Sequence, residues 1–436
     1  MTALIDLSDV GIAIGGLNNV LERAPGYAYL PNDGEPVFGH DAVAVAKLHP
    51  TQINNRFWAD LSTEPTNLSH PKIRHNADLA WFHLKKIKPM LENTAVVLIV
   101  PSSYDQQTLK LLAGVCQSLE ISVAAFVDRA VASCIGHADV SESQVFVDLQ
   151  QHQTLLTFLE TQNGELKKVR VEQIPAHGLV RLQERWLHIL RQRYINASRF
   201  DPMHSGDTEQ QLFSQLNEFL SGSKNDKFDF AISLDDQNLQ ESFSEDELAQ
   251  PYKDLLSEIR EKAEKLPLVL DSFFGGLPGV DTGDGIQLAS AESVFVGAQH
   301  IAAEMSDSTG DIGYFSSGRI LSSSNGAHQS DLPSIIDSGA NNNSATHILL
   351  NGYAYPGGYY DIELNGTGLV LVPRVETDGS HIRFRGQQLE LGSRASELSL
   401  NHSTGVEGAL LRPGDVISFG NAAGVISAIA FKETEK

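Results

Sequence analysis

The chain has 436 residues, too many for one ordinary hydrophobic core, so we expect at least two domains. Its 41% hydrophobic and 20% charged residues are typical of a globular protein, and its net charge of -23 disfavours non-specific binding to nucleic acid or to an anionic membrane. Two cysteines are too few for a disulfide scaffold, and the sequence shows neither a signal-peptide pattern nor a membrane span, so we expect a cytoplasmic protein.

Apolar runs and helical periodicities alternate along the first third of the chain. The run at 95–100 is continuously apolar, which is typical of a strand buried on both faces of a parallel sheet. Ser103 and Gln106 have the spacing of a capping box, so we expect a helix to begin there. Strand alternating with helix predicts an α/β fold. Further strands are expected at 4–7, 10–14, 27–30 and 121–127, and further helices at 76–92 and 130–135.

The pattern begins again near residue 145. The run at 145–149 is similar to that at 3–7, because each is an apolar strand with an aspartate near its end, Asp148 and Asp6. Two halves that open alike indicate an internal duplication. Asn163-Gly164 predicts a hairpin turn, and Ser244 with Glu247 forms a second capping box. Strands are expected at 154–160, 168–174 and 268–270, helices at 180–194, 209–220 and from 244, and a strand or small-residue helix at 294–302.

The composition changes near residue 305. Residues 306–344 are dominated by Ser, Gly and Asn, which predicts a flexible linker. From 345 to 436 the pattern predicts only short strands separated by turns such as Asn365-Gly366 and Pro413-Gly414. About seven strands in this span favour a β-sandwich. They are expected at 347–350, 359–364, 368–375, 382–385, 389–391, 416–419 and 423–431. The expected domains are therefore 1–305 and 345–436.

Residues 97–104 (VLIVPSSY) and the segment QQTLKLLAGVCQSLEI after them resemble a buried strand and the following helix of the actin-like ATPase superfamily. The likeness is greatest to the ATPase domain of the seventy-kilodalton heat-shock chaperones. Residues 4–7, 145–149 and 268–280 come in the order of that family's two phosphate loops and its adenosine loop. The resemblance implies a duplicated actin-like ATPase fold, with two lobes around a cleft, followed here by a separate all-β sandwich domain.

In that family an aspartate followed by glycines and hydroxyl residues forms each phosphate loop. The resemblance implies that Asp6 and Asp148 would hold the waters around Mg²⁺ if ATP were bound. The glycines, which let backbone N–H groups approach phosphate oxygens, are missing, and Ser8 and Gln150 stand in these two loops. A carboxylate at Asp9, about 4 Å from a phosphate, would repel it by on the order of 1 kcal/mol in water.

The adenosine loop departs from the family pattern as well. The family has a glycine pair directly after the strand, whereas here Ser272 lies near the strand end and Gly275 and Gly276 come three residues late. The family's catalytic lysine has no counterpart at 50–58. Asp6, Asp148 and these loop residues therefore form at most a vestigial nucleotide site. Once the glycines are lost, the two aspartates are better explained as turn-forming residues at strand ends than as metal ligands.

Several other residues have a plain structural explanation. His152 is interpreted as a solvated loop histidine, and Cys116 as a core residue on the apolar face of a helix. His70, His75 and His83 have no spacing that fits a metal site and are interpreted as surface groups.

Residues 410–420 (LLRPGDVISFG) are similar to the closing strands of forkhead-associated domains. Those domains usually bind phosphothreonine, but their Ser-x-x-His signature is absent here, and Arg385 and Arg394 are only loose candidates for contacting a phosphate. The resemblance implies a module that binds a protein partner, and leaves its specificity for phosphopeptides open.

Two hypotheses of different class follow. The first is a non-catalytic scaffold or adaptor, a pseudo-ATPase that needs no cofactor and binds protein partners through its β-sandwich or a surface of its first domain. The second is a divergent chaperone-like ATPase that uses Mg-ATP with Asp6 and Asp148. The loss of loop glycines favours the first. Filament assembly, as in actins, stays open, although a charge of -23 opposes self-association at low salt.

Overall fold

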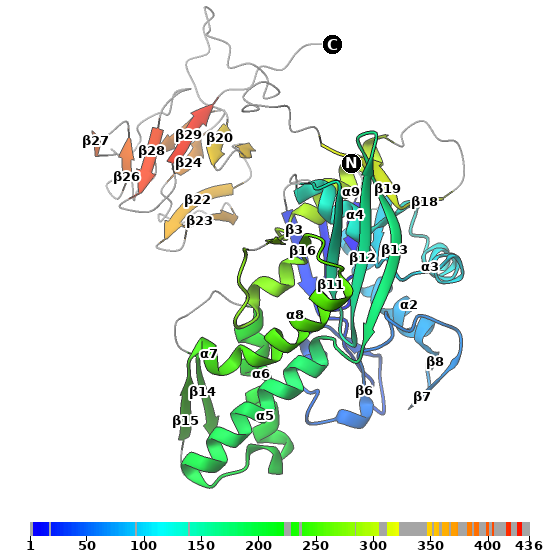
Figure 1. The fold of residues 1–436 in the computed structure, drawn as a ribbon, viewed down its shortest axis with the longest axis vertical. Helices are drawn as coiled ribbons and strands as arrows, with labels where there is room; N and C mark the ends of the chain where they lie inside the picture. The colour runs from blue at the N-terminus through cyan, green and yellow to red at the C-terminus, as the bar shows by residue number, and fades with distance from the viewer. Residues whose placement is uncertain are drawn as a thin grey trace, which may run out of the picture. The chain divides into compact units, whose positions relative to one another are not determined.

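In the computed structural model the chain forms two compact units, Met1–Ser322 and Ser323–Lys436. In the first unit the structure describes residues 3–16, 19–91, 94–137, 140–221, 228–234, 238–283, 285–304 and 312–321. In the second it describes ten short strands. The described chain is mixed α/β with several sheets (Figure 1). None of the described helices has the length and apolar character needed to cross a lipid bilayer.

Two six-stranded sheets form the centre of the first unit, and they share one topology. In each, an antiparallel meander of three strands is extended by two parallel strands on the side of its first strand. In the first sheet the meander is β1 (Ala3–Asp6), β2 (Ile12–Gly16) and β3 (Asn19–Ala24), followed by β9 (Val96–Val100) and β10 (Val123–Asp128). In the second it is β11 (Ser143–Leu149), β12 (Gln153–Gln162) and β13 (Glu165–Pro175), followed by β16 (Leu268–Leu270) and β17 (Ile286–Leu288).

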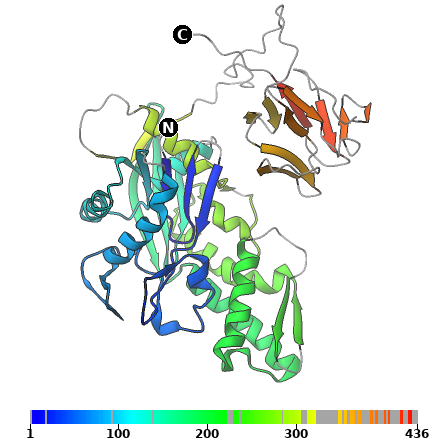
Figure 2. The ribbon, with the colours of Figure 1, turned by 180° about the vertical axis from the view of Figure 1, so that it is seen from behind.

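The apolar run of β9 shows why the first sheet is covered on both faces. Val96 and Leu98 point into a core shared with α2 (Asn76–Ile87) and α3 (Gln106–Ser118). Val97 and Ile99 point the opposite way, into a core shared with the second sheet. Because successive side chains of a strand alternate between faces, a continuous apolar run is required here. Figure 2 shows the blue strands of the first sheet with α2 and α3, in lighter blue and cyan, beside them.

Two helices of small residues lie against each other between the sheets. They are α4 (Arg129–His137), which follows β10, and α9 (Ser293–Glu304), which follows β17, so they hold equivalent places in the two halves. A Cβ added to Gly136 would lie 1.9 Å from the carbonyl oxygen of Ser293, and one added to Gly297 would lie 1.9 Å from that of Ala132. Only glycine fits at either position.

Further helices cover the outer face of the second sheet, below it in Figure 1. They are α5 (Leu179–Ser198), α6 (Gly206–Ser221), α7 (Glu245–Leu248) and α8 (Gln250–Lys262), accompanied by the hairpin of β14 (Phe228–Ser233) and β15 (Asn238–Phe243). The other short elements are β4 (Ala28–Tyr29), β5 (Val37–Phe38), α1 (His40–Val43), η1 (Pro50–Gln52), β6 (Ile53–Asn54), β7 (Pro65–His70), β8 (Ile73–His75), η2 (Lys88–Leu91), η3 (Pro202–His204) and η4 (Ser272–Gly276).

Several local predictions are confirmed and others are wrong. Asn163 and Gly164 have φ of 55° and 78°, as a tight hairpin turn needs, and the capping box of Ser244 and Glu247 is present. The capping box at Ser103 is wrong, because the helix begins at Gln106 and its cap is Asp105, whose carboxylate accepts from the backbone N–H of Thr108 at 2.8 Å. Residues 294–302 belong to helix α9. Strand β3 was not predicted from the sequence.

The predicted linker is wrong at residues 313–319. Two short strands lie there, β18 (Gly313–Phe315) and β19 (Ser317–Arg319). β18 extends the first sheet beside β10, and β19 extends the second sheet beside β13. We call 312–321 the strap, because it joins the edges of both sheets.

The strands of the second unit form two antiparallel sheets. One has the order β21-β20-β29-β28-β26-β27 and the other β23-β22-β24-β25. The predicted turns at Gly366 and at Pro413-Gly414, Arg394, and most of 410–420 lie outside the described residues. The strands are β20 (His347–Leu350), β21 (Tyr353–Pro356), β22 (Tyr360–Asn365), β23 (Gly368–Pro373), β24 (Ile382–Arg385), β25 (Gln388–Leu391), β26 (Leu398–Leu400), β27 (Ser403–Thr404), β28 (Val416–Phe419) and β29 (Val425–Ile429).

Candidate functional site

A buried arginine, Arg129, lies between the two sheets. Arg129 is 2% exposed, and its guanidinium contacts three carboxylates. Its Nε donates to Asp6 at 2.8 Å, one Nη to Asp148 at 2.6 Å and the other Nη to Asp271 at 2.5 Å. We call these four residues the Arg129 cluster. A planar guanidinium with a fork of donors suits such a site better than the point charge of a lysine.

The strand pattern explains why the three aspartates meet. Each stands two residues after an apolar side chain of the core between the sheets: Leu4 before Asp6, Phe146 before Asp148, and Val269 before Asp271. Alternation along a strand therefore turns all three carboxylates toward the same space. Asp148 and Asp271 are also neighbours across the second sheet, since the parallel register pairs Val147 with Leu270, one residue earlier in each strand.

Asp128, the residue before Arg129, holds the start of α4 in place. Its carboxylate accepts hydrogen bonds from the Ser102 hydroxyl at 2.8 Å, from Lys168 Nζ at 2.7 Å and from the Tyr314 hydroxyl of the strap at 2.7 Å. It also accepts from the backbone N–H of Ala130 at 3.0 Å, which caps the helix. A cation at a helix N-terminus is disfavoured by the helix dipole, so Arg129 depends on its carboxylate partners.

One guanidinium cannot balance three buried carboxylates. Burial raises the pKa of Asp148 to about 8, against the pull of Arg129, and Asp271 and Asp6 raise it further. Burial and the two neighbouring carboxylates therefore favour the protonated form of Asp148, which would reduce the repulsion within the cluster. Gln150 donates to the other oxygen of Asp148 at 3.4 Å, whereas Asp6 Oδ2 has no hydrogen-bond partner among the described residues.

The loops after β1 and β11 are bonded to each other beside the cluster. Asp9 accepts from the backbone N–H of Gln151 at 2.9 Å, and the Gln151 side chain donates to the Asp9 carbonyl at 3.2 Å. Burial raises the pKa of the Asp9 carboxyl to about 7, and the Gln151 hydrogen bond opposes the shift. Ser8 is buried as well, and its hydroxyl has no partner in the part of the chain that is described.

The loop after β11 fills the N-terminus of α5 with its own backbone. The carbonyls of Gln150 and Gln151 accept from the N–H groups of Leu179 and Val180, both at 2.9 Å. These are among the free donors that a helix N-terminus offers to an anion, so they are already used. Gly178 must be glycine for this contact, because its Cβ would lie 2.4 Å from the backbone nitrogen of Gln153.

His152 belongs to this junction, so its interpretation as a solvated loop histidine is wrong. Its Nε2 lies 2.9 Å from the side-chain oxygen of Asn55, and burial lowers its pKa to about 4. His70 and His83 are also buried, which corrects their interpretation as surface groups, and the side chain of His75 caps α2. Cys116 lies in the core, as the apolar face of its helix predicted.

The residues after β16 have structural roles. Asp271 caps η4 through the N–H of Phe273 at 2.8 Å while it binds Arg129. A Cβ on Gly276 would lie 2.1 Å from the Leu220 carbonyl oxygen at the end of α6. Close packing against α6 therefore accounts for this glycine. Ser272 and Gly275 lie in the same turn, and no hydrogen bond from them to the Arg129 cluster is found within the described ranges.

Asp6 and Asp148, which the sequence predicts in one site, bind one guanidinium, and Gln150 contacts the same site. Arg129, Asp271 and the bonded pair Asp9–Gln151 were not predicted from the sequence. One signal was available, because Asp128-Arg129 are the only charged residues in the mostly apolar stretch 121–135. Charges in such a stretch must be buried and paired.

The residues of this site do not fit Mg-ATP. An oxygen of each aspartate in the Arg129 cluster is already bound to the guanidinium. The loops that would approach a triphosphate are bonded to each other through Asp9 and Gln151. The gap between Leu7, Asp9, Tyr104 and Gln150 has no space for even one water molecule.

Comparison with known proteins adds no assignment. No model of a protein family matches the chain, and no curated protein is significantly similar to it. The geometry of the site is therefore the basis for the function.

Proposed function

We propose that the chain is a non-catalytic scaffold or adaptor. In this proposal the first unit has the actin-like ATPase fold in its heat-shock-chaperone form, with a nucleotide site replaced by the Arg129 cluster. The second unit is a β-sandwich, similar to forkhead-associated domains, that binds a protein partner. Neither unit needs a cofactor for this function.

The repeated topology supports the fold proposed for the first unit. Apart from the strap strands β18 and β19, its two sheets have the same order and strand directions, and α4 and α9 occupy equivalent places between them. The three aspartates of the Arg129 cluster stand at the ends of β1, β11 and β16, which are the strands before the loops that the family uses for phosphate and adenosine.

One observation is the main support for the proposal that catalysis has been lost. The guanidinium of Arg129 donates to Asp6, Asp148 and Asp271 at 2.5 to 2.8 Å. In the family the first two of these positions hold the waters around Mg²⁺. Here a built-in cation supplies the positive charge that Mg²⁺ would otherwise bring. Removing one partner from a buried ion pair costs about 3–5 kcal/mol. Binding of Mg-ATP that displaced Arg129 from the aspartates would have to offset this loss of free energy.

The bonds between the two halves support a platform of fixed shape. Asp9 and Gln151 join the loops of the two sheets, Asn55 and His152 lie in hydrogen-bond contact, and the strap pairs with the edges of both sheets. An ATPase that hinges about a cleft would have to break these bonds in each cycle. A platform for a partner gains from keeping them.

The proposal is tested by thermal unfolding of the intact chain with and without Mg-ATP. We expect no change in the unfolding temperature, because the site does not accept the nucleotide. A ligand present at 100 times its dissociation constant would stabilise the fold by about 2.7 kcal/mol. A concentration-dependent rise that needs both Mg²⁺ and ATP would contradict the proposal and favour the divergent ATPase instead.

A further inference from the structure

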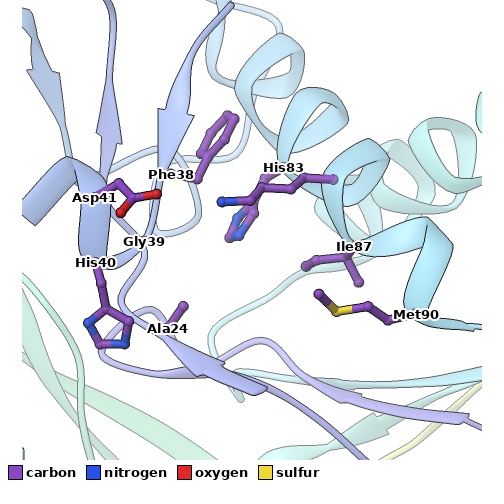
Figure 3. A pocket seen from close by; sticks show the side chains of 9 residues that line it. Ala24, Phe38, Gly39, His40, Asp41, His83, Ile87 and Met90 are labelled. Atoms are coloured by element: carbon purple, nitrogen blue, oxygen red, sulfur yellow. The ribbon is translucent and has the colours of Figure 1, made fainter. Parts of the chain in front are cut away.

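A second hollow of the first unit lies away from the Arg129 cluster, between α1 and α2 (Figure 3). Its volume is about 190 Å³. An apolar cavity of about 150 Å³ is large enough to hold benzene, so this one admits a molecule of that size or somewhat larger. Its walls combine apolar side chains with a few polar groups, the usual composition of a small-molecule site.

His83 provides a directed donor in the inner wall. Its side chain is 4% exposed, and its ring stacks on Phe38 with centroids 4.8 Å apart. Its Nδ1 accepts from the indole N–H of Trp58 at 3.1 Å, and burial lowers its pKa to about 3, so the single ring proton is on Nε2. No described residue accepts a hydrogen bond from Nε2. In Figure 3 the ring of His83 lies toward the centre of the hollow.

Two opposite charges line the hollow without meeting. Asp41 comes from α1 and Lys86 from α2, and within the described residues neither forms an ion pair. The neighbouring lysines behave differently, because Lys85 pairs with Glu35 at 3.6 Å and Lys88 with Glu120 at 3.5 Å. Lys86 and Asp41 are thus available to a ligand that carries both an anionic and a cationic group.

The remaining wall is apolar. Ile87 and Met90 lie side by side along it in Figure 3, and Met90 is 41% exposed. An exposed methionine beside a hollow is an adaptable contact for an aliphatic side chain.

We propose that this hollow binds a small zwitterion, a free α-amino acid with an apolar side chain. The ligand carboxylate accepts from Lys86 and from His83 Nε2–H, its ammonium donates to Asp41, and its side chain packs on Ile87 and Met90. A simple carboxylic acid would leave Asp41 unpaired beside a second anion. A simple amine would leave the two donors unused. This proposal does not depend on whether the chain binds a nucleotide.

The test is calorimetric titration of the intact chain with L-leucine and with two analogues that each lack one charge. These are 4-methylpentanoate, without the ammonium, and 3-methylbutylamine, without the carboxylate. We expect saturable binding of L-leucine, with each analogue weaker by roughly tenfold or more, since a hydrogen bond to a charged group is lost. Absence of leucine binding at millimolar concentration would overturn the proposal, as would equal binding of either analogue.

Substitutions in the hollow test which side chains bind the ligand. Lys86→Met and Asp41→Asn should each weaken leucine binding about tenfold or more. Lys85→Met is the matched control, since this lysine precedes Lys86 but does not line the hollow, and it should bind leucine like the unmodified protein. Asp41→Asn should not weaken 4-methylpentanoate further. All three side chains are exposed, so unchanged thermal unfolding would show that the fold is intact. Leucine binding that neither Lys86→Met nor Asp41→Asn alters would contradict the assignment.

Discussion

At the scale of single residues, Arg129 supplies the positive charge at the buried centre of the first unit. It is the cation that lets three aspartates stay buried together. Asp6 and Asp148 were predictable because each lies near the end of an apolar strand, a pattern visible in the sequence. Arg129 was not predictable, because its partners lie 19 to 142 residues away and no local pattern connects them.

Removing this cation should therefore destabilise the fold strongly. Arg129→Met leaves the carboxylates buried without a counter-charge, and we expect a loss of about 3–5 kcal/mol in the free energy of unfolding. Urea denaturation of the intact chain measures it. Arg74→Met is the matched control, because that arginine is 78% exposed in its pair with Asp78, and we expect little change. Equal effects of the two substitutions would show that the Arg129 cluster contributes nothing.

Asp9 makes stability depend on pH. Its pKa is raised by burial from 3.8 to about 7, so between these values the folded state binds more protons than the unfolded chain. The stability contribution of this group therefore falls as the pH rises through that window. His83 and His152 act in the opposite sense, since burial lowers their pKa values to about 3 and about 4, and they reduce stability as the pH falls below 6.5.

The variant Asp9→Asn isolates the first effect. The free energy of unfolding of the variant minus that of the unmodified chain should be larger at pH 8 than at pH 5, by roughly 2–3 kcal/mol. The reason is that the carboxyl of Asp9 ionises in this window, whereas the amide of the variant does not. Urea midpoints at the two pH values give the comparison. A difference between the two proteins that is the same at both values would mean that Asp9 stays ionised in the folded state.

At the scale of elements, the fit of α4 against α9 depends on two glycines. Gly136→Ala and Gly297→Ala place a methyl group against helix backbone, and each should lower stability by about 1–3 kcal/mol, as overpacking does. Gly114→Ala in α3 is the control, because nothing lies within 4 Å of its Cβ position. This change should stabilise the helix by about 0.5–1 kcal/mol. Thermal unfolding compares all three, and a stabilising Gly136→Ala would contradict the packing.

Elements with a strong local signal were predictable and those fixed by distant contacts were not. The buried run at β9 and the Asn163-Gly164 turn follow from their own residues. The strap has short strands in a segment rich in serine and glycine, and only pairing with β10 and β13 makes them strands. The cap of α3 was predicted at Ser103 but lies at Asp105. Serine and aspartate both suit an N-cap, so residue type alone did not distinguish the two positions.

At the scale of the whole molecule, the repeat of one topology in two sheets follows from the resemblance between residues 3–7 and 145–149. What the sequence could not predict is how the halves are joined. The contacts of Asp9 with Gln151 and of His152 with Asn55 link residues about a hundred positions apart or more. The bulky residues of the loops predicted that a phosphate would fit badly, but not which residues would contact one another.

A crystal structure of the intact chain, grown with Mg-ATP in large excess, tests the central claim most directly. It should show the Arg129 guanidinium still bound to Asp6, Asp148 and Asp271, with no nucleotide between the two sheets. A nucleotide seated there, with Mg²⁺ beside Asp6 and Asp148 and Arg129 displaced from them, would contradict the account.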